Sequence, residues 1–433
     1  MSEANPGAIR RLREAARDAS FLTPGLADAA LSSLAGFAAS LYAVRSLDSP
    51  GLGAYSLYLA AYVVGALFAQ QLLFLPSQIA ALKARPSDRP AILGPTLRAG
   101  AVLSAFVAPV VASAGLIVSG HVSSSTLVAL GAGAAALTVV TPMQDHVRST
   151  LYLAGEHVRA ALVSAAQLVF TCLGLGILYV LGTADAWVPF GALAIGTAAS
   201  GLIGLAVTTF PPSGSFTVPP ARSLMRTGRT LLPAALIQEA TVFFAAATLA
   251  SVASAAALGS AEAARIVSRP VQALSLGVSR SLAPRLMEAG ESRSSTQAWR
   301  AARFYTAAIA AAGLLYLALA GWSYPLSPFE EVVPAAYEEE GLVALFLVAT
   351  LAGAIIQIPR GVLLGANKGS ELLVITIFTS VTRLGAVALL ALSIEAYALP
   401  VAHLLSLLLG GGLGLRATLR LFERTDQGGS GQA

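Results

Sequence analysis

Charged residues are scarce in this chain. Lys, Arg, Asp and Glu make up 11% of its 433 residues, whereas hydrophobic residues make up 56%. A soluble domain of this length needs many more polar residues to cover its surface. The composition therefore excludes an ordinary soluble globular protein and favours an integral membrane protein built from helices.

Residues that hold metals, form disulfides or carry out catalysis are also few. The one cysteine, Cys172, lies in an apolar run, which leaves no intrachain disulfide and no cysteine-based metal site. The four histidines are scattered without the spacing of a zinc site. The sequence has no Asp-x-Asp pair, Gly-rich phosphate loop or Ser-His-Asp set. We expect no enzyme activity, no metal and no cofactor.

Apolar runs of the length needed to cross a bilayer core, roughly 20 residues, recur throughout the chain. They lie at 22–44, 53–76, 97–119, 124–145, 159–182, 186–208, 230–252, 261–284, 301–321, 341–363, 371–393 and 396–416. The first run is too long for the core of a signal peptide, so we interpret it as an uncleaved span. The expected fold is an all-α integral membrane protein with about 12 transmembrane helices.

The charges between these runs predict the orientation. Arg and Lys gather at the N-terminus, after every second run and in the C-terminal tail, whereas loop 322–340 is rich in Glu. By the positive-inside rule, both termini are cytoplasmic. The predominance of Arg over Lys indicates a bacterial source, so we expect a multi-pass protein of the bacterial cell membrane.

The two halves of the chain repeat each other at an offset of about 206–212 residues. Leu52-Gly53 matches Leu258-Gly259, Pro76 matches Pro284, and Arg148–Gly155 matches Arg360–Asn367. Because each unit has six runs, the halves enter the membrane the same way up, with the substrate path between them. The predicted parts are an amphipathic cytoplasmic segment (1–20), an N-lobe (21–210), a cytoplasmic linker (211–229), a C-lobe (230–420) and a flexible tail (421–433), with a central cavity between the lobes.

Ionisable residues inside a bilayer cost at least ~2.5 kcal/mol each and need a reason to be there. In run 261–284, polar residues spaced by three and four form a stripe that includes Arg265 and Gln272, with Arg269 beside it. We expect Arg265 about one turn, and Arg269 about two turns, below the outer surface. Arg383 is expected near mid-membrane, as is Glu239, and Asp28 in the cytoplasmic half of the first span.

Two interpretations of these charges remain open. Glu239 could neutralise Arg269 or Arg383 only to hold helices together. Alternatively, an excess of Arg in a water-filled cavity attracts an anion, since the guanidinium fork suits a pyrophosphate. Tyr55, Tyr58 and Tyr62 share a helix face. We expect the first two in the interfacial aromatic belt, and Tyr62 deeper, where it could stack on a sugar.

Three features together resemble the polysaccharide-exporter and Wzx-type lipid-linked oligosaccharide flippase family, within the MATE-like MOP superfamily. They are the turn at Leu41–Tyr62, the segment Leu258–Leu286, and the Arg-x-x-Leu-x-x-Ala repeats. The chain departs from the pattern at Ala261, where the family usually has Tyr. The resemblance implies a flippase that moves a polyprenyl-pyrophosphate-linked oligosaccharide from the inner to the outer leaflet by rocking of its lobes.

The residues predicted from this interpretation fall into two groups. Substrate binding is assigned to Arg265, Arg269, Gln272, Arg383 and Tyr62. Coupling to an H⁺ or Na⁺ gradient is assigned to Asp28 and Glu239. The expected partners are membrane lipids and the lipid-linked glycan, and not nucleic acid; we expect a monomer, working alone or alongside glycan-assembly enzymes.

Other functions compete with this one. A MATE-like multidrug or cation antiporter would have the same fold, but its site should be dominated by carboxylates. A membrane glycosyltransferase or polysaccharide polymerase usually needs a substantial outer loop, and the longest one here, about Trp322–Glu340, is short and acidic. A scaffold subunit without transport activity would leave the arginines within the membrane unexplained.

Overall fold

The computed structural model describes residues 27–28, 30–82, 84–183, 185–210, 217–320 and 341–428, and these are almost entirely helical, with no strand among them. The predicted amphipathic segment 1–20 and the acidic loop 322–340 lie outside these residues. Counting α2 and α3 as one continuous helix, the described residues contain twelve long helices. The sequence prediction of an all-α fold with about 12 helices is confirmed.

The first half begins with a helix over residues 30–46, preceded by helical residues 27 and 28. The other helices are α2 (Ser49–Ala69), a π-helix (Gln70–Phe74), α3 (Leu75–Ala81), α4 (Leu93–Ala112), α5 (Ser124–Leu153), α6 (His157–Val180) and α7 (Val188–Val207).

A residue of the polar turn before α2 fixes where this helix starts. The Asp48 carboxylate accepts a hydrogen bond from the Gly51 amide at 2.9 Å, which caps the new helix.

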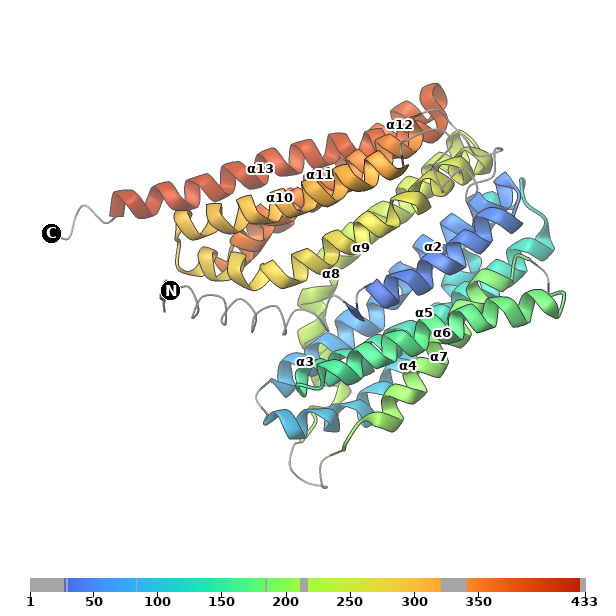
Figure 1. Cartoon of the computed structure of the whole chain (residues 1–433), viewed down its shortest axis with the longest axis horizontal. Coiled ribbons are helices and arrows are strands. Elements are labelled where there is room, and N and C mark those ends of the chain that lie inside the picture. The colour runs from blue at the N-terminus through green and yellow to red at the C-terminus, as the bar shows by residue number, and fades with distance from the viewer. Residues whose placement is uncertain are drawn as a thin grey trace, which may run out of the picture.

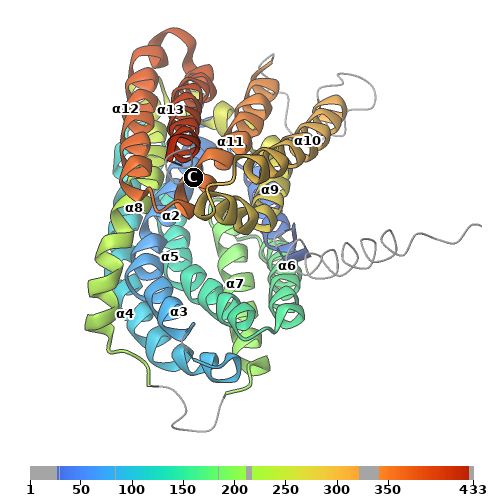
Figure 2. The same ribbon diagram turned by 90° about the vertical axis from the view of Figure 1, so that its left-hand side faces the viewer.

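The second half contains α8 (Ala221–Val252), α9 (Ala255–Glu291), α10 (Ser295–Ala320), α11 (Leu342–Gly365), α12 (Gly369–Ile394) and α13 (Ala398–Gly428). Helix α8 already begins inside the predicted linker 211–229, and α13 continues into the predicted tail. Figures 1 and 2 show the helices α10–α13 on one side and α3–α7 on the other. The two groups converge where α2 and α9 begin and diverge toward the C-terminal end of α13 (Figure 1).

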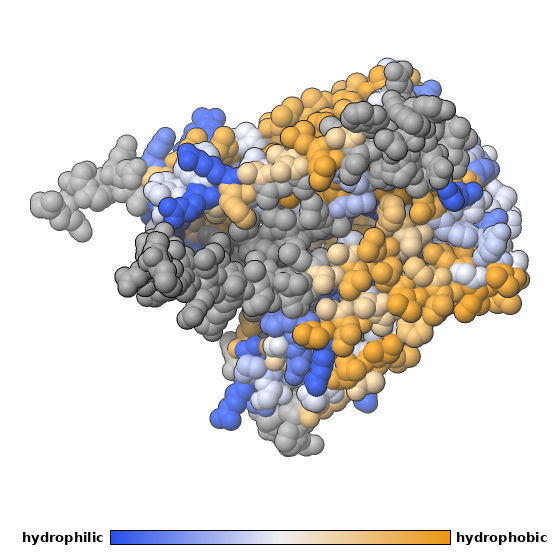
Figure 3. Space-filling view, viewed as in Figure 1, coloured by the Kyte–Doolittle hydropathy of each residue, from blue (hydrophilic) through white to orange (hydrophobic). Residues whose placement is uncertain are grey.

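The helices have the properties of membrane spans. Eight helical segments among the described residues are long and apolar enough to cross a bilayer. Large apolar side chains face outwards, including Phe106 on α4 (77% exposed) and Leu389 on α12 (82% exposed). Hydrophobic residues cover much of the face in Figure 3, and hydrophilic ones lie at the left ends of both lobes. Such a surface is unfavourable in water but suits lipid, so the chain is a multi-pass membrane protein.

The lobes meet through a reciprocal contact between α2 and α9. A Cβ atom placed on Gly53 would lie 1.9 Å from the carbonyl oxygen of Ala255, and one placed on Gly259 would lie 2.2 Å from that of Ser49. These glycines, like Ser49 and Ala255, are 206 residues apart. Each copy of the repeat therefore makes the same contact with the other, as two equivalent surfaces do about a two-fold axis. Glycine is required at both positions because the backbones approach so closely.

Helix α8 connects the lobes by packing as well as by sequence. It contacts α2 and the π-helix of the first half and α12 of the second. At Gly228, an added Cβ would lie 2.5 Å from the carbonyl oxygen of Gln71 in the π-helix. A π-helical turn carries a local distortion of the helix and recurs at functional sites. In this protein it lies where α8 crosses the first half.

Candidate functional site

Glu262 on α9 is the residue around which two of the predicted arginines are arranged. Its side chain is fully buried. It accepts hydrogen bonds from Nε and Nη2 of Arg265, at 2.8 and 2.9 Å, and from Nη2 of Arg269 at 3.0 Å. The sequence interpretation considered Glu239 as the partner of Arg269 and overlooked Glu262. The signal was present, because residues three and seven positions apart lie on one face of a helix.

Glu262 and Arg269 also form hydrogen bonds with residues of the first half of the chain. Ser56 on α2 donates a hydrogen bond to Glu262 at 2.9 Å. Arg269 donates through Nη1 to the hydroxyl of Ser40 and, at 3.3 Å, to the carbonyl of Gly36, both on the first helix. The Ser40 and Tyr55 hydroxyls are 3.0 Å apart. We call these seven residues (Gly36, Ser40, Tyr55, Ser56, Glu262, Arg265 and Arg269) the inter-lobe network.

The helix that carries the two arginines begins earlier than the sequence predicted. Helix α9 begins at Ala255 instead of near residue 261, because Ser254 caps it by accepting a hydrogen bond from the Ala257 amide at 3.0 Å. At 1.5 Å per residue, Arg265 lies about 15 Å and Arg269 about 21 Å along the helix, which is about three and four turns from its start. Gln272 is exposed, further along the same helix. The network is therefore well inside the helical bundle.

A second group of polar side chains lies within the second half. Glu239 on α8 is within electrostatic range of Arg265, Arg360 and Arg383, and His403 on α13 is within range of Arg383. Two buried nitrogens, Nε of Arg383 and Nδ1 of His403, have no hydrogen-bond partner among the described residues. We call Glu239, Arg360, Arg383 and His403 the C-lobe cluster. Together with Arg265, it contains three guanidinium groups that act electrostatically on one carboxylate.

Asp28 belongs to a third group, inside the first half. It is buried (2% exposed) and accepts a hydrogen bond from Ser164 on α6. Nη1 of Arg148 on α5 lies 3.6 Å from the Asp28 carboxylate, and Nη2 of the same residue lies 2.6 Å from Asp145. The two carboxylates predicted to couple ions, Asp28 and Glu239, therefore lie in different halves of the fold. Asp28 is already paired with an arginine.

Buried amide and hydroxyl groups lie in the same half. Gln144 donates to Gln167 at 3.4 Å, and Gln167 donates to Thr197 at 3.1 Å, which joins α5, α6 and α7. All three side chains are buried. In a bilayer, polar groups satisfied between helices in this way hold the helices together.

The tyrosines of α2 are not placed as the sequence suggested. Tyr55 and Tyr58 are 1% and 2% exposed, so the prediction that they form an interfacial belt is wrong. Helix α2 is an interior helix, in contact with α4, α5, α8 and α9. The Tyr58 hydroxyl bonds to the carbonyls of Ala112 and Leu127, at 3.1 Å each. Tyr62 is partly buried and packs edge-on against Phe190 at 6.5 Å between ring centroids.

The predicted substrate residues are thus divided among several surroundings. Arg265 and Arg269 share one carboxylate, Arg383 lies in the C-lobe cluster, and Tyr62 packs within the first half. Among the described residues, no three His, Cys, Asp or Glu side chains are grouped so that they could hold a metal ion.

No protein-family model matches the chain, and no curated protein matches it. Solved structures do match. An inward-facing MATE multidrug-resistance transporter of the MOP superfamily is 14% identical, with a TM-score of 0.68 over 90% of this chain and 96% of that one. The MATE multidrug transporter DinF-BH, solved in complex with a ligand, is 14% identical, with a TM-score of 0.66 over 94% of this chain and 96% of that one.

A MATE-family transporter of the MOP superfamily in the outward-facing conformation gives a lower TM-score, 0.58, at 14% identity over 93% of this chain and 95% of that one. At these identities the likeness concerns the fold. The chain has the MATE-like fold of MOP-superfamily transporter structures.

Proposed function

We propose that this protein is an alternating-access transporter that moves a polyprenyl-pyrophosphate-linked oligosaccharide from the inner to the outer leaflet of a bacterial cytoplasmic membrane. The observation that carries the proposal is the excess of guanidinium groups in the second half. Arg265, Arg360 and Arg383 all act electrostatically on one carboxylate, Glu239, and Arg265 also pairs with Glu262. A buried Arg nitrogen without a partner is costly, and an anionic ligand would supply the missing acceptor.

The three arginines predicted from the sequence, Arg265, Arg269 and Arg383, are unequal candidates for binding the pyrophosphate. Arg269 donates to Glu262, Ser40 and Gly36, so its donors are engaged in this conformation. Arg383 has a free buried Nε, and the Arg265 side chain is 34% exposed. We therefore assign the first contact with phosphate to Arg383 and Arg265. Arg269 becomes available when the lobes separate and the inter-lobe network breaks.

Asp28 is the carboxylate through which we propose that transport is coupled to an ion gradient. Asp28 is neutralised by Arg148, which it shares with Asp145. In our proposal, a proton or Na⁺ that binds Asp28 displaces Arg148 toward Asp145. This changes the packing of the first helix against α5 and α6, and the first helix carries the Ser40 contact of the inter-lobe network. The coupling step is thereby linked to the closure of the lobes through one helix.

A MATE-like multidrug or cation antiporter is the second candidate. It is favoured by the fold of the structural neighbours, which include multidrug transporters, and by three buried or partly buried carboxylates, Asp28, Glu239 and Glu262. Two of these, Asp28 and Glu262, form ion pairs with arginines. A cationic drug would have to compete with those arginines, whereas a pyrophosphate could bind Arg383, whose buried Nε has no partner among the described residues.

One reconstitution distinguishes the candidates. Proteoliposomes are loaded with a labelled polyprenyl-pyrophosphate-linked sugar, and the label on each leaflet is measured by a membrane-impermeant reagent, with uptake of the cationic dye ethidium measured in parallel. We expect leaflet exchange of the glycan lipid and no dye transport. Arg383→Ala should lower the exchange at least tenfold, whereas Arg222→Ala, an exposed arginine at the start of α8, should not. Dye transport without glycan exchange would favour the antiporter.

A further inference from the structure

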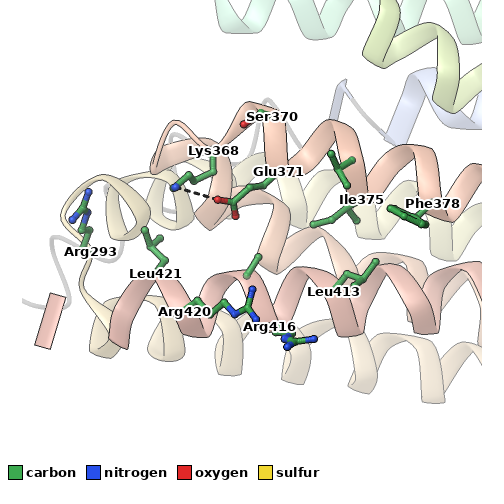
Figure 4. A pocket seen from close by; sticks show the side chains of 12 residues that line it. Arg293, Lys368, Ser370, Glu371, Ile375, Phe378, Leu413, Arg416, Arg420 and Leu421 are labelled. Carbon is green, nitrogen blue, oxygen red and sulfur yellow. Dashed lines mark ion pairs between the residues drawn. The ribbon is translucent and has the colours of Figure 1, made fainter. Parts of the chain in front are cut away.

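A pocket of about 550 Å³ lies in the second half, away from the sites described above. It is formed by the N-terminal half of α12 and the C-terminal half of α13, with Arg293 from the turn between α9 and α10 (Figure 4). The size is within the range of small-molecule sites. The charge distribution of the sequence places this end of the bundle on the cytoplasmic side.

One end of the pocket is strongly basic. Arg293, Lys368, Arg416 and Arg420 line it, against a single carboxylate, Glu371. Glu371 is engaged, because Nζ of Lys368 lies 3.1 Å from it (Figure 4). Arg293, Arg416 and Arg420 form no ion pair with a carboxylate of the described residues. The remaining positive charge therefore attracts an anion, and guanidinium groups favour phosphate.

The other end of the same pocket is apolar. Val374, Ile375 and Phe378 on α12 face Leu413 on α13 across it. Val374 is 51% and Phe378 56% exposed, and the outer surface of both helices continues in exposed apolar residues such as Val381 and Leu408. A soluble anion without a hydrocarbon chain would make no favourable contact with these apolar side chains. A ligand that fits both ends has an anionic head and a hydrocarbon chain.

We propose that this pocket binds an anionic phospholipid of the adjacent leaflet. Its phosphate lies among Arg293, Arg416 and Arg420, and one acyl chain follows Val374 and Phe378 into the bilayer. Basic pockets between transmembrane helices on the cytoplasmic side hold lipid headgroups by this combination of charge and apolar contact. The lipid would bridge α12 and α13, and it is separate from the transported lipid, whose phosphate we assign to Arg383 and Arg265.

Native mass spectrometry of the full-length protein tests the site without any transport assay. The protein is purified in detergent with equimolar phosphatidylglycerol and phosphatidylcholine, and the lipid retained per protein is measured. We expect preferential retention of phosphatidylglycerol. Arg416→Gln with Arg420→Gln should lower that retention about tenfold, and Phe378→Ala should lower it several-fold. A matched pair, Arg222→Gln with Arg226→Gln on α8, removes the same charge at the same side and should leave it unchanged.

Four results would overturn the proposal. The pocket variants could retain as much phosphatidylglycerol as the unchanged protein. The α8 pair could lose as much lipid as the pocket pair, which would indicate attraction by net charge alone. Inorganic phosphate or glycerol phosphate at millimolar concentration could displace the lipid completely, which would make the site one for a soluble anion. Finally, the Phe378→Ala variant could retain as much phosphatidylglycerol as the unchanged protein, which would contradict the acyl-chain contact.

Discussion

Replacing Glu262 with Gln tests whether the inter-lobe network holds the lobes together where α2 and α9 begin. The substitution keeps the size of the side chain and removes its charge. Within α9, both Arg265 and Arg269 then lose their carboxylate. Across the lobes, Ser56 loses a charged acceptor, and Arg269 is no longer held in position to donate to Ser40 and Gly36.

The size of the effect follows from the contacts that cross between the lobes. A hydrogen bond to a charged group contributes about 1.5–3 kcal/mol and a neutral one about 0.5–1.5 kcal/mol, so the Ser56 contact weakens by about 1 kcal/mol. Loss of the ordered Arg269 contact removes about 1.5 kcal/mol more. The sum of about 2.5 kcal/mol corresponds to a roughly 70-fold shift from the closed toward the open arrangement of this end.

Distances between spin labels measure that shift. Labels at Gly120→Cys and Ser251→Cys, in a Cys172→Ser background, report the separation of the two lobes at the end where α2 begins. We expect the Glu262→Gln protein to show a longer distance population that is absent or minor in the unchanged protein. Glu371→Gln, which removes an acid paired with Lys368 far from the network, is the matched control.

The reasoning would be refuted by Glu262→Gln distances that match those of the unchanged protein while the protein remains folded. A shift of equal size in Glu371→Gln would show that the effect is not specific to the network. Ser56→Ala offers an independent check. It removes one inter-lobe hydrogen bond without leaving an unpaired charge, so a smaller shift in the same direction is expected.

Three further outcomes are expected. Gly53→Ala should lower the thermal stability by an amount equivalent to about 1–3 kcal/mol, since its Cβ would lie 1.9 Å from the carbonyl of Ala255. Gly36→Ala, whose Cβ meets no atom within 4 Å, should not lower the melting temperature in the same experiment, because Ala favours a helix over Gly. Asp28→Asn should cost less stability than Glu262→Gln in parallel melting experiments, because Arg148 keeps its other carboxylate partner, Asp145, at 2.6 Å. The same Asp28→Asn variant should transport without dependence on an ion gradient, and full dependence would show that Asp28 does not take part in coupling. Tyr58→Phe should lower stability by about 1 kcal/mol, as judged by the melting temperature, and no change would mean that water replaces the hydroxyl at Ala112 and Leu127.

Much of the fold could be predicted from the sequence because its signals are local. The length of each apolar run reports a helix that can cross a bilayer, and the 206-residue offset of Gly53 and Gly259 reports the repeat. Helix ends were less predictable. Small residues such as Ala255 and Ala257 continue α9 beyond its apolar run, and only the Ser254 cap marks where it starts.

The candidate site was predicted in part. Arginine is unusual in an apolar run, and three such arginines lie in the second half of the chain. Their positions, Arg265, Arg269 and Arg383, therefore indicated which half carries the ionisable residues of the candidate site. Their partners were harder to assign. Glu262 lies three residues before Arg265 and so continues the stripe, but the stripe was taken to begin at Arg265. Nothing in the sequence near Tyr55 indicated that this side chain would be buried against Phe190 instead of lying at the membrane surface.

The sequence by itself determined that this is a helical membrane protein, because hydrophobic length and periodicity are properties of single segments, and it predicted two related halves. Tertiary structure decided which charges neutralise each other and which remain available. Ser40 and Ser56 reach Arg269 and Glu262 only because Gly53 and Gly259 let α2 and α9 approach to backbone contact. That approach depends on packing between residues 206 positions apart, and no local pattern encodes it.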